Sequence, residues 1–247
     1  NGGKGSLFDR AVSLITGIFT PLLGLMCGCG ILKGLSVFLG ALGLITTTSG
    51  TYIIINAVGD VIFYFFPVFV GYTAAKKFGM NEFVGAAIGA SLIHPNIAAL
   101  SSADTLFTAF AGTIFETNVT TTFAGIPVLM MNYASTVIPA ILAVWVGSKI
   151  EKFFKKVIPA VVRMFLVPAL TLLITVPLTL LAVGPVANWI SDIIGSIFMA
   201  VHDFSPVLTG TLVGGLWQVL VVFGLHQGIV PIQISNLMNN GFENVIC

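Results

Sequence analysis

The sequence predicts an all-α polytopic membrane protein with about six to seven transmembrane helices, and three observations support this fold class. First, 57% of the 247 residues are hydrophobic and only 8% are charged, whereas about 25% of the residues of a soluble domain are charged. Second, apolar runs near the length of about 20 residues that one helical crossing needs recur along the chain. Third, Lys and Arg gather in alternate connections between these runs. We therefore expect lipid to cover most of the surface.

The first three apolar runs are each interrupted by proline or by an ionisable side chain. They cover residues 11–45, 52–75 and 83–100. Lys33 in the first run and Asp60 in the second have opposite charges, so we expect a structural ion pair between two helices. The alternative is that these groups couple transport to ion movement, because ionisable side chains inside a membrane are costly and by default suggest function.

The middle of the chain changes character after the third run. Residues 101–122 are rich in β-branched Thr and predict a loop or hairpin. The fourth and fifth runs, residues 123–146 and 164–187, predict two further spans. Between them, the lysines of residues 149–156 predict a solvated loop beside lipid headgroups. His94-Pro95, at the end of the third run, is either a functional group or the mark of a helix end.

The last part of the chain is harder to assign to spans. Residues 188–204 are apolar but contain acidic side chains and a histidine, so they form either an interfacial amphipathic helix or a further span. The sixth run, residues 207–230, is interrupted near residues 224–231 by two glycines and a proline, which predicts a broken or re-entrant segment. We expect two parts, residues 1–187 with five spans and residues 188–247 with the connector and a second half that begins there.

Basic residues predict the orientation in the membrane. Lys4 and Arg10 precede the first run, Lys76 and Lys77 follow the second, and the lysines of residues 149–156 follow the fourth. The connections after the first and third runs contain no Lys or Arg. Because Lys and Arg in short connections favour the cytoplasmic side, we expect a cytoplasmic N-terminus.

His226 is the strongest candidate for a binding residue. It lies between Gly224 and Gly228, where a helix break exposes backbone groups beside an imidazole and an amide. Such a site suits a polyhydroxylated ligand, although a histidine that only caps the break is the alternative. Motifs for ATP, structural metals or a nucleophile are missing, so we expect no metal and no cofactor. A net charge of +1 gives no indication of a nucleic-acid partner.

Several stretches resemble the membrane-embedded IIC component of the bacterial phosphoenolpyruvate-dependent sugar phosphotransferase system, glucose superfamily, β-glucoside branch. They are GIFTP at residues 17–21, ILKG at 31–34, NAVGDVIFYFFP at 56–67, GYTAAKKF at 71–78 and GGLWQVL at 214–220, continuing to His226 and Pro231.

The resemblance implies a homodimeric permease in the bacterial inner membrane. Such proteins carry a sugar inward while a phosphocysteine on a IIB domain phosphorylates it. His226 matches a sugar-binding histidine of the family, and Gln218 stands where glucose and maltose relatives have an arginine, which favours the β-glucoside branch. We expect Gln218, Gln227 and Asn240 to be further hydrogen-bonding partners of the sugar.

Residues 1–187 would then be the interface or scaffold half, and residues 188–247 the start of the sugar-binding half. A later Gly-Ile-Thr-Glu-Pro motif of the family is missing before Cys247. We therefore expect the chain to be part of a longer polypeptide.

Two other functions remain open. One is an ion-coupled secondary transporter of a small polar solute, with Asp60 and His94 as a proton relay and broken helices around the substrate. The other is a non-catalytic membrane subunit or channel, which the glycine-rich spans also fit.

Overall fold

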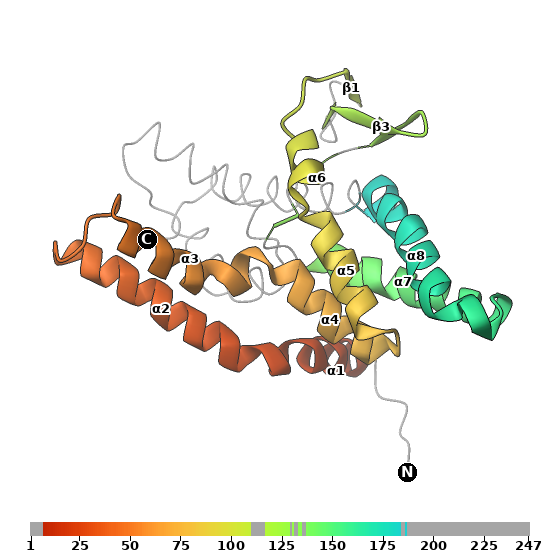
Figure 1. Ribbon diagram of the computed structural model, residues 1–247, viewed down its shortest axis with the longest axis horizontal. Coiled ribbons are helices and arrows are strands. Elements are labelled where there is room, and N and C mark those ends of the chain that lie inside the picture. The colour runs from red at the N-terminus through yellow and green to blue at the C-terminus, as the bar shows by residue number, and fades with distance from the viewer. Residues whose placement is uncertain are drawn as a thin grey trace, which may run out of the picture. The chain divides into compact units, whose positions relative to one another are not determined.

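The computed structural model describes residues 7–109, 117–128, 130, 133–134, 137–183 and 186 (Figure 1). The chain divides into two compact units. The first comprises Asn1–His94, Tyr133–Ser135 and Ala140–Val176, and the second comprises Pro95–Asn132, Thr136–Pro139 and Pro177–Cys247. Each unit is described by itself.

The first apolar run forms two helices joined by a tight turn. Helix α1 spans Leu7–Phe19, the 3₁₀ turn η1 spans Thr20–Leu22, and helix α2 spans Leu23–Ala41. Pro21 lies at the start of the turn, where its missing N–H costs least. The 3₁₀ turn at Pro21 therefore separates two helical segments of one long apolar stretch.

The second run also forms two helical segments, α3 (Gly50–Tyr64) and α4 (Phe66–Phe78). Ser49 caps α3 by accepting a hydrogen bond of 3.2 Å from the backbone N–H of Tyr52. Pro67 lies in the first turn of α4, and Gly79 ends that helix with a φ of +68°. A left-handed residue after the last turn satisfies helix carbonyls, and glycine adopts this conformation without strain.

The third run forms α5 (Glu82–Leu92) and the short α6 (Pro95–Leu100). Asn81 caps α5 by accepting hydrogen bonds from the backbone N–H groups of Phe83 and Val84, at 3.0 and 3.2 Å. Pro95 lacks an N–H and disfavours helical geometry in the residue before it. The chain therefore leaves the helix at His94.

Glycines allow α4 and α5 to lie against each other (Figure 1). A Cβ atom at Gly85 would overlap the Gly71 carbonyl oxygen and the Cβ of Ala75, and one at Gly89 would overlap the Pro67 carbonyl. Gly85 and Gly89 form a G-x-x-x-G pair on one face of α5, a spacing that lets helix backbones approach closely in membranes. Among the glycines that the structure describes, an added Cβ atom would come closest to a neighbour at Gly89, where that neighbour is the Pro67 carbonyl oxygen.

Two short antiparallel hairpins follow in the second unit. Strand β1 (Phe107–Ala109) pairs with β2 (Thr117–Val119), and β3 (Thr121–Phe123) pairs with β4 (Ile126–Val128). Ala124 and Gly125 join β3 and β4, with φ values of +50° and +82°. Two consecutive positive φ values are typical of the tight turns that match the twist of a hairpin.

The loop or hairpin predicted for residues 101–122 is confirmed for the residues of this range that the structure describes, but the predicted helical span at residues 123–146 is wrong. Strands occupy its beginning, and helix α7 starts only at Ile138. The Ala124–Gly125 turn is the physical reason, because its backbone angles are incompatible with a continuing helix.

Helix α7 spans Ile138–Val157 and helix α8 spans Ala160–Leu178, continued by a π-helical turn over Thr179–Val183. The lysines of residues 149–156 lie within α7, so their prediction as a loop is wrong. Lysine is a good helix former, and Lys155 pairs with Glu151 one turn earlier at 3.1 Å.

Helix α7 is attached to the turn between α4 and α5. The buried Glu151 carboxylate accepts from the backbone N–H of Asn81 at 3.3 Å, and the Lys152 ammonium donates to the Phe78 carbonyl at 2.9 Å. Two of the predicted basic clusters, Lys76–Lys77 and the lysines of α7, therefore lie at the same end of the first unit.

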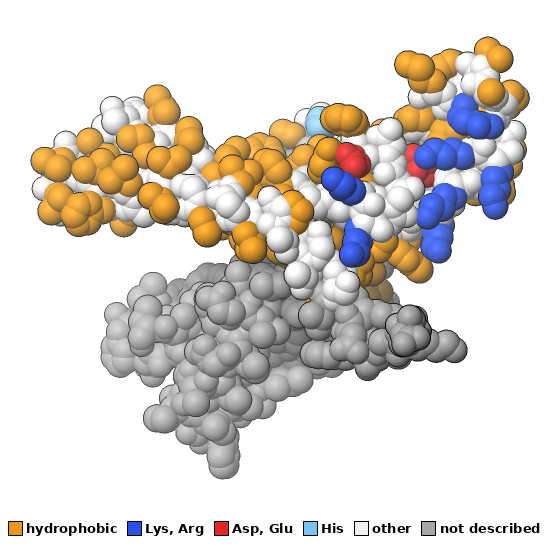
Figure 2. All heavy atoms as spheres, turned by 90° about the horizontal axis from the view of Figure 1, so that it is seen from below, with side chains coloured by type: hydrophobic (Ala, Val, Ile, Leu, Met, Phe, Trp, Pro, Cys, Tyr) orange, Lys and Arg blue, Asp and Glu red, His pale blue; other side chains and the backbone are white. Residues whose placement is uncertain are grey.

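Four helical stretches in the described residues are long and apolar enough to cross a membrane: Ser13–Ala41, Gly50–Phe78, Glu82–Leu100 and Ala160–Val183. Large apolar side chains are exposed along the α2–α3 hairpin, and Figure 2 shows hydrophobic side chains covering this part of the surface. These features support the predicted helical, multi-pass membrane protein. The segments at residues 188–204 and 224–231 lie outside the described residues.

Candidate functional site

Lys33 on α2 and Asp60 on α3 form the ion pair that the sequence predicted. Their side chains are 44% and 34% exposed, so the pair lies at the edge of the helix contact. A Cβ atom at Gly59 would lie 2.5 Å from the backbone nitrogen of Lys33. Glycine beside Asp60 is therefore what lets the two backbones come close enough for this pair.

Two further polar side chains extend the pair into a small network. Ser36 donates to the Lys33 carbonyl at 2.7 Å, and Asn56 donates to the Ser36 hydroxyl at 3.3 Å. Ser36 follows Lys33 by three residues and Asn56 precedes Asp60 by four, spacings that place residues on one helix face. Ser36 was not among the residues predicted from the sequence, although its spacing from Lys33 is a signal that the sequence contains.

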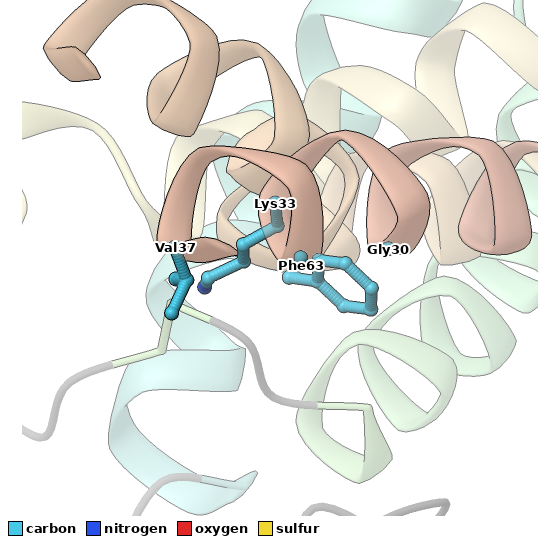
Figure 3. A pocket seen from close by; sticks show the side chains of 5 residues that line it. Gly30, Lys33, Val37 and Phe63 are labelled. Atoms are coloured by element: carbon cyan, nitrogen blue, oxygen red, sulfur yellow. The ribbon is translucent and has the colours of Figure 1, made fainter. Parts of the chain in front are cut away.

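A hollow of about 440 Å³ lies beside this network. Its lining consists of Gly30, Lys33, Gly34, Val37 and Phe63. The Lys33 ammonium lies 5.9 Å from the centre of the Phe63 ring, and Figure 3 shows Lys33, Val37 and Phe63 around the same space. The only charged side chain in this lining is Lys33, which is already paired with Asp60, and the rest of the lining is apolar. This lining contains no base or nucleophile, so we assign the network a structural role.

His94 lies at the C-terminal end of α5, where the helix stops before Pro95. Its backbone N–H donates to the Ser91 carbonyl at 3.3 Å, and the residue is exposed. The position agrees with the interpretation of His94-Pro95 as a helix end. The carboxylate of Asp60, its partner in the proton-relay hypothesis, is engaged by Lys33.

The predicted sugar-binding residues His226, Gln218, Gln227 and Asn240 lie outside the described residues. Their assignment stays a prediction from the sequence.

We expect Asp60→Ala to destabilise the protein by about 1–3 kcal/mol, because it leaves the Lys33 ammonium without its acceptor among apolar side chains. The double variant Lys33→Met/Asp60→Leu should recover most of this loss, since replacing both partners of an ion pair by apolar groups is often neutral. Thermal unfolding of the full-length protein in detergent measures both effects. A double variant as unstable as Asp60→Ala would contradict the structural role.

Comparison with known proteins adds a family match. A family model described as "Phosphotransferase system, EIIC" matches residues 16–246. The chain is 48% identical over 240 residues to the "PTS system beta-glucoside-specific EIIBCA component" of Halalkalibacterium halodurans, covering 97% of this chain and 38% of the relative. It is 40% identical over 243 residues to a component of the same description from Dickeya chrysanthemi, covering 98% of this chain and 37% of the relative.

A third relative is the "PTS system arbutin-, cellobiose-, and salicin-specific EIIBC component" of Escherichia coli (strain K12). It is 34% identical over 232 residues, covering 94% of this chain and 46% of the relative. The chain thus spans less than half the length of these relatives. No solved structure matches it.

Proposed function

The chain belongs to the EIIC family of the phosphotransferase system, and on this premise we propose that it is the membrane part of a β-glucoside permease. In this proposal the sugar crosses the inner membrane and receives a phosphoryl group from the phosphocysteine of a IIB domain. The observation that carries the proposal is the 48% identity to a β-glucoside-specific component across 97% of the chain.

The descriptions of the relatives support a IIB partner. These three relatives are described as EIIBCA or EIIBC components, and this chain covers 37–46% of their length. We propose that the IIB domain is fused to the same polypeptide and that the reacting cysteine lies there. The EIIC part would contribute by holding the acceptor hydroxyl in line with the phosphoryl group, since positioning supplies much of the rate in phosphoryl transfer.

We propose that His226, Gln218, Gln227 and Asn240 hold the sugar by hydrogen bonds. Imidazole and amide groups suit a neutral, polyhydroxylated substrate because they both donate and accept. The glutamine at residue 218 supports a β-glucoside rather than glucose or maltose. Residues 188–247 would then begin the sugar-binding half, and residues 1–187 would form the scaffold.

We also propose that the N-terminus and the lysine-rich end of the first unit face the cytoplasm, where a IIB domain would reach the sugar. One support is that Lys and Arg occur before the first run and after the second and fourth runs, but not after the first and third. A second support is the hydrogen bond from Lys152 to the Phe78 carbonyl, which brings two of the basic clusters together.

A homodimer is the further part of the proposal. A Cβ atom at Gly30 or Gly34 on α2 meets no described atom within 4 Å. Gly30 and Gly34 form a G-x-x-x-G pair, a spacing that favours close helix association in membranes.

Uptake of labelled salicin by cells that express the full-length protein tests the proposal against an ion-coupled transporter. We expect uptake to require a functional phosphoenolpyruvate phosphorylation chain and to persist, over a short assay, when an uncoupler collapses the proton gradient. Uptake that the uncoupler abolishes in cells still able to phosphorylate would favour the ion-coupled alternative.

A further inference from the structure

One face of α7 combines cations with exposed aromatic side chains. Trp145, Lys149, Phe153 and Lys156 follow one another at intervals of four, four and three residues and are all exposed. This spacing places them on one side of the helix. We call these four residues the basic face of α7.

The opposite side of α7 packs inside the first unit. Val144, Ser148 and Glu151 are 0%, 2% and 1% exposed. Burial of these three residues prevents α7 from rotating about its own axis. The basic face therefore points away from the rest of the first unit.

Lys149 and Lys156 of the basic face lack the protein partners that the neighbouring Lys152 and Lys155 have among the described residues. Lys155 pairs with Glu151, and Lys152 donates to the Phe78 carbonyl. Among the residues that the structure describes, Lys149 and Lys156 form no ion pair; the Lys149 ammonium lies 5.8 Å from the centre of the Trp145 ring. Both charges are thus available to an anion outside the molecule, and Figure 2 shows Lys and Arg side chains gathered at one end of the described surface.

The basic face lies next to the start of a candidate span. The apolar stretch Ala160–Val183 begins four residues after Lys156. Just inside that stretch Val161 and Met164 are each 90% exposed and Phe165 is 64% exposed. Tryptophan and lysine side chains at the end of a span are typical of the boundary between the hydrocarbon core and the headgroups.

We propose that the basic face of α7 binds the phosphate of anionic phospholipid headgroups. Clusters of basic residues directly beside a span attract anionic lipids, with about 1 kcal/mol per Lys or Arg near the surface. The interleaved apolar side chains favour lipid over a phosphorylated protein domain. Phe153 and Val157 are 60% and 63% exposed beside these lysines, and acyl chains next to the headgroups would cover them.

The test compares lipid binding by the full-length protein and by its Lys149→Gln/Lys156→Gln variant. Purified protein in a neutral detergent is titrated with short-chain phosphatidylglycerol or phosphatidylcholine, and bound lipid is counted by native mass spectrometry. We expect the double variant to bind phosphatidylglycerol about thirtyfold more weakly, because two contributions of about 1 kcal/mol add up and each 1.4 kcal/mol changes the affinity about tenfold. Phosphatidylcholine binding should stay unchanged.

The charge-preserving variant Lys149→Arg/Lys156→Arg is the matched control, and it should bind phosphatidylglycerol like the unaltered protein. Equal unfolding temperatures of all three proteins in the same detergent show that folding is intact. The proposal is overturned if the glutamine variant keeps full phosphatidylglycerol binding. It is also overturned if that variant loses only its binding to an isolated phosphorylated IIB domain, which would assign the face to a protein partner.

Discussion

His226→Ala is expected to abolish sugar uptake by the full-length protein while the variant still folds and inserts. The substitution removes the imidazole from the Gly224–Gly228 segment and leaves a sugar hydroxyl without its partner inside the membrane. When a site hydrogen-bonds a substrate hydroxyl, loss of one of the two partners leaves the other buried and unpaired, and this greatly lowers activity toward that substrate. We expect at least a hundredfold lower uptake of labelled salicin, measured in cells with matched amounts of membrane-inserted protein.

His94→Ala is the matched control for this experiment, because it removes the same side chain from an exposed helix end. The permease account predicts near-normal uptake for His94→Ala. The ion-coupled alternative predicts the reverse, since His94 would then carry protons. Normal uptake by His226→Ala would remove the site assignment.

Gly89→Ala is expected to destabilise the first unit by about 1–3 kcal/mol, the usual cost of overpacking a tight contact. The added methyl group would overlap the Pro67 carbonyl and lie 2.9 Å from the Val68 Cα atom. Both are backbone atoms, so α4 and α5 can relieve the overlap only by moving apart. Thermal unfolding in detergent and the yield of monodisperse protein measure this loss.

Gly28→Ala is the matched control, because a Cβ atom there meets no described atom within 4 Å and Gly28 lies on a different face of α2 from Gly30 and Gly34. Alanine stabilises a helix interior relative to glycine by about 0.5–1 kcal/mol. We therefore expect Gly28→Ala to be neutral or slightly stabilising. Equal unfolding temperatures for Gly89→Ala and Gly28→Ala would show that the α4–α5 contact is looser than described.

The helical runs were predictable because membrane spans are defined by length and apolarity, which the sequence displays directly. Pro21, Pro67 and Pro95 all stand at helix starts or breaks, as their missing N–H requires. The Lys33–Asp60 pair was predictable for a related reason. Opposite charges in consecutive apolar runs have few other partners within reach.

The hairpin over residues 121–128 and the course of α7 were not predictable from apolarity. The hairpin depends on positive φ values at Ala124 and Gly125, and alanine gives no hint of such a conformation. The lysines of α7 are hydrophilic, which suggested a loop, but helix α7 is anchored by Glu151, whose burial depends on a turn about 70 residues earlier. A contact between such distant residues leaves no local pattern in the sequence.

The sugar-binding assignment came from family resemblance and from glycines around His226. Those residues lie outside the described part of the chain, so their geometry is a prediction. The close approach of α2 and α3 at Gly59, in contrast, follows from the structure alone.

The chemical form of the transported sugar tests the central claim most directly. Right-side-out vesicles that contain the full-length protein, the phosphorylation chain and phosphoenolpyruvate are given labelled salicin, and the label inside is separated by chromatography. We predict that it is recovered as the sugar phosphate ester and that omission of phosphoenolpyruvate prevents accumulation. Accumulation of the unmodified sugar would contradict transport coupled to phosphorylation.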